Sequence, residues 1–200
     1  MKKRIAVLAA AVMISAALAA PAVYADETEV TNTSDNPIEF SYEDVDDSIF
    51  EGQWWDTGLG FDICLPKDWI DNELTEEMLA AGLVHIYGEE GGGANCTITY
   101  TALPEEVADT YDIDQLGAEL AESNTAALFA DLSGIPAVIF ENDETCISGF
   151  AMLDGNGNLI QGVISAPSDD QYEEYGPVFM NITTSISPTV TDEASTETEE

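Results

Sequence analysis

The chain has 200 residues, of which 40 are acidic and four are basic, so its formal net charge at pH 7 is −36. Nucleic-acid binding requires cations that displace counterions from phosphates, and a chain this negative repels the polyanion. Binding to anionic membrane surfaces is excluded on the same electrostatic grounds. The sequence therefore predicts neither a nucleic-acid partner nor membrane insertion.

The first 25 residues have the pattern of a bacterial secretory signal peptide. Three basic residues at 2–4 precede an apolar run at 5–20, and Val23-Tyr24-Ala25 fits the small-x-small rule for a cleavage site. We expect cleavage near Ala25 and release of a secreted, extracellular protein. Its only remaining cation would be Lys67.

Both ends of the mature chain are polar and acidic. Residues 26–44 contain few apolar side chains, and residues 188–200 are rich in Ser, Thr and Glu. Such segments cannot bury enough apolar surface to offset the entropy of ordering. We therefore expect two acidic disordered tails around a single domain at residues 45–187.

The first half of this domain is expected to contain three strands and a short helix. Alternating apolar residues predict a strand at 59–65. Thr75 begins a short helix, which Gly82 follows. Residues 83–87 and 94–100 then read as the two arms of a hairpin.

In the second half, Asp112 and Gln115 form a capping-box pattern at the start of a helix. Strands are expected at 135–140, 147–153 and 159–165, the last two joined by the turn sequence DGNGN. A final helix begins near Ser168, and Pro177 should kink it or divide it in two. This order predicts an α+β domain with a mainly antiparallel sheet of about six strands, covered by helices on both faces.

Several stretches resemble the PsbP-like α/β/α sandwich family. They are the proline-tryptophan step in GFDICLPKDW, the strand GIPAVIFENDE preceded by a helix, the three-stranded meander and the closing Ser-Ile-Ser. The resemblance covers about residues 52–187 and extends to exported bacterial proteins without an assigned activity. It implies a binding or assembly role, and it transfers no site residue because no site motif is present.

The three tryptophans are the most distinctive candidate residues. Neighbours in an extended segment point to opposite faces, so Trp54 and Trp55 cannot form one flat platform. We expect one of them to be packed and the other to be exposed, and we expect Trp69 to be an anchor in the core. The candidate binding residues are Trp54, Trp55 and Asp56, since an exposed indole beside a carboxylate can stack on a sugar.

Other candidate sites have simpler structural explanations. The run Asp154–Asn158 begins like a calcium loop but has Leu159 and Ser165 where glycine and glutamate belong, so a hairpin turn explains it. His85 reads as an ordinary strand histidine without a neighbouring nucleophile motif. No catalytic residue, metal site or cofactor is predicted.

The three cysteines, Cys64, Cys96 and Cys146, permit at most one disulfide, with three possible pairings and one thiol left over. All three can equally be free, buried residues.

We expect an exported, non-enzymatic binding or assembly module whose partner is unknown. Two alternatives stay open: a glycan-binding module that uses Trp54 or Trp55 with Asp56, and, less favoured, an acid-dependent hydrolase built on two carboxylates.

Overall fold

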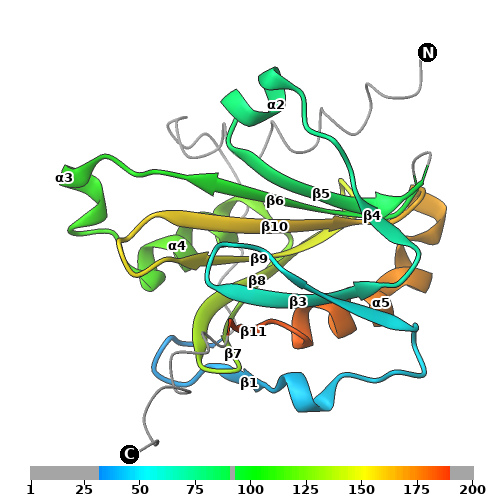
Figure 1. Cartoon of the computed structure of the whole chain (residues 1–200). Coiled ribbons are helices and arrows are strands. Elements are labelled where there is room, and N and C mark those ends of the chain that lie inside the picture. The colour runs from blue at the N-terminus through cyan, green and yellow to red at the C-terminus, as the bar shows by residue number, and fades with distance from the viewer. Residues whose placement is uncertain (1–31, 91–92, 190–200) are drawn as a thin grey trace, which may run out of the picture.

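A computed structural model describes residues 32–90 and 93–189 of the chain (Figure 1). The signal peptide predicted for residues 1–25 lies outside these ranges, as do residues 26–31 and 190–200 of the two predicted tails. Among the helices in the described ranges, none is long and apolar enough to cross a bilayer.

In the part of the chain that the structure describes, the main sheet has eight strands in the order β1-β7-β8-β9-β10-β6-β5-β4. Neighbouring strands are antiparallel except for the pair β1 and β7, which is parallel. The strand bounds are β1 (Ile38–Phe40), β4 (Trp69–Asp71), β5 (Leu83–Glu89), β6 (Asn95–Thr101), β7 (Ala126–Leu132), β8 (Ile135–Asn142), β9 (Ile147–Leu153) and β10 (Leu159–Ser165).

A second, smaller sheet has three antiparallel strands in the order β11-β3-β2. Its strands are β2 (Gly52–Asp56), β3 (Phe61–Pro66) and β11 (Ser187–Pro188). Figure 1 shows β3 lying across the near face of the main sheet. The apolar residues Phe61, Ile63 and Leu65 of β3 are buried in the core between the two sheets. The small sheet therefore acts as part of a covering layer.

Within residues 32–90 and 93–189, four α-helices and two 3₁₀-helices connect the strands. Thr75 caps α2 by accepting a hydrogen bond from the Met78 N–H, and Asp112 and Gln115 form the predicted capping box of α4. Helix α5 continues through Pro177, so of the two outcomes expected there, a kink or two short pieces, the division into two pieces does not occur. The bounds are η1 (Tyr42–Asp44), α2 (Glu76–Ala80), α3 (Glu105–Ala108), α4 (Ile113–Ser123), η2 (Asp169–Gln171) and α5 (Tyr172–Thr184).

The core has two parts, one on each face of the main sheet. On one face, Leu116 and Leu120 of α4 pack on Val138 and Phe140 of β8. On the other face, α5 and the small sheet cover residues such as Ile139 of the same strand. Successive strand residues alternate between the faces, so both sides of β8 are buried. The predicted α+β class is confirmed.

The sheet is larger than the six strands that the sequence predicted. Strand β7 was not predicted because its sequence, AALFADL, is rich in alanine and leucine, which favour helices. Strands β1 and β4 contain three residues each, too few for a periodic pattern. The predicted strand at 59–65 corresponds to β3 but belongs to the small sheet.

We placed residues 26–44 in a disordered tail, but the described part of that segment, residues 32–44, contains β1 and η1 and contacts the domain. Side-chain amides hold this segment to the backbone of the domain. The Asn32 amide accepts from the Phe129 N–H and donates to the Phe129 carbonyl, at 2.7 and 2.8 Å. The buried Asn181 makes the same pair of contacts with the backbone of Asp46. Because these partners are 97 and 135 residues apart in sequence, an argument from local composition could not find them.

Candidate functional site

The two neighbouring tryptophans of β2 lie on opposite faces of the small sheet. Trp55 is opposite Ile63 and packs against the core, where its ring centroid lies 5.2 Å from that of Tyr87. Trp54 points the other way and is 48% exposed. Trp69, at the start of β4, is only 3% exposed, and burying a side chain of this size contributes about 2–3 kcal/mol. Trp69 and Trp55 are therefore anchors, and Trp54 is available for contact.

A second aromatic ring, which the sequence analysis assigned to a tail, lies beside Trp54. The Tyr42 ring of η1 is 6.4 Å from the Trp54 ring, at an angle of 85°, and is 47% exposed. Asp56 shares the Trp54 face of β2, because residues two apart in a strand point the same way. We call Tyr42, Trp54 and Asp56 the Trp54 surface. Its perpendicular rings form a corner rather than a flat platform.

His85 of β5 contacts two oxygen acceptors. Its Nδ1 lies 3.0 Å from the Asp71 carboxylate, and its Nε2 lies 3.0 Å from the Thr57 backbone carbonyl. The ring also stacks on Tyr87, with 5.0 Å between centroids. A catalytic histidine would direct its second nitrogen at a hydroxyl or thiol nucleophile. Here that nitrogen faces a carbonyl, so the arrangement ties β4 and β5 to the small sheet instead of forming a catalytic dyad.

The Asp154 turn has the hydrogen bonds of a hairpin. Asp154 accepts bonds from the backbone N–H groups of Asn156 and Asn158, both at 2.8 Å, and from the Tyr100 hydroxyl. Its carboxylate is thus oriented by the turn itself. Over residues 32–90 and 93–189, no three His, Cys, Asp or Glu side chains gather as they would around a metal ion.

All three cysteines are free. Burial raises the pKa of the Cys96 thiol to about 12. Burial also raises the pKa of Cys64, with a further contribution from the negative charge of Asp47. The pKa of Cys146 is raised by the same effect and by Asp169 and Asp143. Because the thiolate is the nucleophile, these environments disfavour cysteine chemistry.

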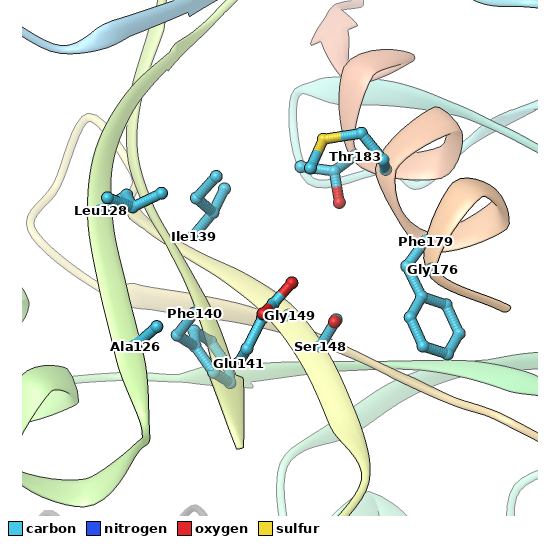
Figure 2. Close-up of a pocket in the computed structure, with 11 residues that line it drawn as sticks. Ala126, Leu128, Ile139, Phe140, Glu141, Ser148, Gly149, Gly176, Phe179 and Thr183 are labelled. Atoms are coloured by element: carbon cyan, nitrogen blue, oxygen red, sulfur yellow. The ribbon is translucent and has the colours of Figure 1, made fainter. Parts of the chain in front are cut away.

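A groove that is open to solvent lies between α5 and strands β7 to β9. Figure 2 shows the oxygens of Glu141 and Ser148 directed into this space, opposite Phe179 and Thr183 of the helix. Glu141 and Ser148 are cross-strand neighbours on β8 and β9. The groove is mostly apolar with one carboxylate, and it does not include any of the three candidate binding residues.

No protein-family model matches this sequence, and no curated protein matches it either. Among solved structures, the chain is similar to the solution structure of cyanobacterial PsbP (CyanoP) from Synechocystis sp. PCC 6803. The TM-score is 0.48 and the identity is 15%, over 69% of this chain and 92% of the cyanobacterial one. That protein carries the name of the family that the sequence resembles, and none of its other properties is carried over to this chain.

Proposed function

We propose that this chain is an exported, non-enzymatic binding module that works at the cell envelope or outside the cell, and that the Trp54 surface binds a protein partner. The half-exposed indole of Trp54 carries this proposal. A tryptophan contributes more to binding than most residues because its large, rigid side chain loses little entropy on contact. Here it stands on an exposed strand next to a second exposed ring.

The non-enzymatic part of the proposal is supported by the surroundings of the most reactive side chains. Both nitrogens of His85 face acceptors. The three thiols are in environments that oppose ionisation. Neither set of contacts provides a general base next to a nucleophile, which acyl-transfer chemistry requires.

A comparison of immobilised chains tests the binding role. Wild type, Trp54→Ala and a control, Leu79→Ala, are exposed to envelope and secreted proteins of the source organism, and the retained proteins are identified by mass spectrometry. Leu79 is the control because it is 56% exposed and lies on α2, away from the small sheet. We expect proteins that wild type and Leu79→Ala retain and that folded Trp54→Ala does not. The proposal would be overturned if all three chains retain the same proteins. It would also be overturned if wild type retains no protein beyond those that Trp54→Ala retains.

The same exposed indole favours glycan binding as a second candidate. A sugar ring can stack on the free face of Trp54, and the Asp56 carboxylate on the same strand face can accept hydrogen bonds from its hydroxyls. Titration of tryptophan emission with soluble cell-wall and dietary glycans tests this candidate. A saturable shift that disappears in Trp54→Ala would support it, whereas a flat response would leave the protein partner as the function.

A further inference from the structure

The edges of the two sheets differ in how well they are protected. Strand edges expose unpaired backbone groups, and proteins protect them with short strands, prolines, lysines or bulges. In the described residues, β1 and β4 have three residues each, and β11 has two and ends in Pro188. Strand β2 is an edge with five residues, and it contains no proline, lysine or bulge.

The register shows which backbone groups of β2 are free. The Lys67 N–H donates to the Glu51 carbonyl, and the Thr57 N–H donates to the Phe61 carbonyl. In an antiparallel pair such hydrogen-bonded positions alternate along the strand. Residues 51, 53, 55 and 57 therefore direct their N–H and C=O groups at β3. Gly52, Trp54 and Asp56 direct theirs away from it, and all three residues are exposed.

These observations carry an inference that rests on the proposed binding role of the Trp54 surface. We propose that the free edge of β2 binds an extended, positively charged peptide segment of the partner, which adds a fourth strand to the small sheet. Main-chain hydrogen bonds to residues 52, 54 and 56 supply affinity in this mode, and alternate side chains supply specificity.

Charge decides what kind of segment fits. Asp56 lies on the edge itself, and Asp47 is near enough to Cys64, the residue opposite Trp54, to contribute to its raised pKa. Lys67, the one cation outside residues 2–4, is engaged in an ion pair with Glu51. An acidic strand would be repelled here, whereas lysine or arginine at alternate positions would pair with the carboxylates.

The strand period also sets the spacing of the side chains in the segment. Neighbouring strands place side chains of the same face side by side at every second residue. An apolar residue beside Trp54 therefore has its same-face neighbours two positions away on either side. A basic residue at one of these positions lies beside Asp56. The expected pattern is basic-x-apolar, read in either chain direction.

A synthetic probe tests the inference by isothermal calorimetry on the full chain. The probe is a seven-residue peptide, blocked at both ends, in which lysine, isoleucine and lysine alternate with threonine. We expect saturable binding that disappears when glutamate replaces both lysines. Equal binding of the two peptides would overturn the charge assignment.

Two protein variants separate strand addition from simple contact with the indole. Trp54→Ala removes the indole and keeps the backbone donor, whereas Trp54→Pro removes both. Because the N–H of residue 54 makes no bond to β3, proline should leave the β2–β3 ladder intact. We expect Trp54→Pro to bind the probe about three- to tenfold more weakly than Trp54→Ala, which is the effect of one backbone hydrogen bond.

Backbone-methylated peptides provide the same test on the wild-type chain. Two isomers of the probe are methylated on alternate amides, and strand addition requires that one isomer loses binding while the other keeps it. If both isomers bind equally and Trp54→Pro matches Trp54→Ala, the edge inference is wrong. The wider binding role of the Trp54 surface would then still be tested separately, by the retention experiment.

Discussion

The Nδ1 atom of His85 lies 3.0 Å from the Oδ2 atom of Asp71, which joins the interior of β5 to the edge strand β4. The other ring nitrogen reaches the Thr57 carbonyl at the end of β2. An imidazole with one proton donates to only one of these acceptors, and a doubly protonated ring donates to both. One side chain thus links the main sheet to the end of the strand that carries the Trp54 surface.

Replacing His85 by alanine should destabilise the domain, because both contacts and the stacking on Tyr87 are lost. We expect the free energy of unfolding to fall by about 1–3 kcal/mol, measured by urea denaturation. Asp71→Asn is the matched variant, since it keeps an acceptor oxygen for the ring. It should lower the free energy of unfolding by less than His85→Ala does. Unchanged stability of His85→Ala would show that the link does not hold the two sheets together.

The glycine at position 162 should not tolerate a side chain. Gly162 of β10 is paired with Phe150 of β9, and a Cβ atom at this position would overlap the Phe150 ring. Gly162→Ala should therefore destabilise the domain by about 1–3 kcal/mol through overpacking. Gly155→Ala is the control, because no atom lies within 4 Å of its Cβ position. Equal melting temperatures for the two variants would contradict the packing described for this strand pair.

The Asp154 turn should lose its contribution to stability in acid. Burial alone would raise the pKa of Asp154, but hydrogen bonds from Asn158, Asn156 and Tyr100 outweigh it and hold the pKa below its ordinary value. A carboxyl whose folded pKa is lowered contributes stability above the unfolded pKa, near 4, and loses it as the pH falls through the folded value.

The measurement is the difference in unfolding free energy between wild type and Asp154→Asn. We expect wild type to be the more stable chain near pH 7 and the difference to shrink toward zero as the solution is acidified below about pH 4. A difference that stays constant over this range would mean that the charge of Asp154 does not stabilise the turn.

The cysteines should behave as three free thiols with low reactivity. Cys64 and Cys96 are buried, and only Cys146 is partly exposed. In the native protein we expect slow alkylation at Cys146 alone, and in urea we expect rapid alkylation of all three, counted by mass spectrometry. A reducing agent should leave the melting temperature unchanged. A drop in melting temperature on reduction would instead reveal a disulfide.

Local signals predicted some elements well. Strands β9 and β10 have the predicted bounds, 147–153 and 159–165. Two apolar runs flank the sequence DGNGN there, which is typical of a hairpin turn. The capping box of Asp112 and Gln115 is equally local, since the two residues are three positions apart. The opposite orientation of Trp54 and Trp55 followed from the strand period alone.

Other features depend on partners that are remote in sequence. The strand period could not show which of Trp54 and Trp55 faces the core. Trp55 does, where its ring packs against Tyr87 of β5, a residue remote in sequence. Tyr42 was assigned to a tail because the segment around it is acidic. Contacts with residues remote in sequence hold that segment, among them the pairing of β1 with β7 and the hydrogen bonds of Asn32 and Asn181. The link between His85 and Asp71 was missed because β4 is too short to give a pattern.

Amide hydrogen exchange along β2, followed by NMR, tests the central claim most directly. In the free protein, Gly52, Trp54 and Asp56 should exchange quickly and Gln53 and Trp55 slowly, as the register requires. Adding the lysine-containing peptide should slow the exchange of the first three amides. Binding of the peptide with no change in those three amides would contradict strand addition at this edge.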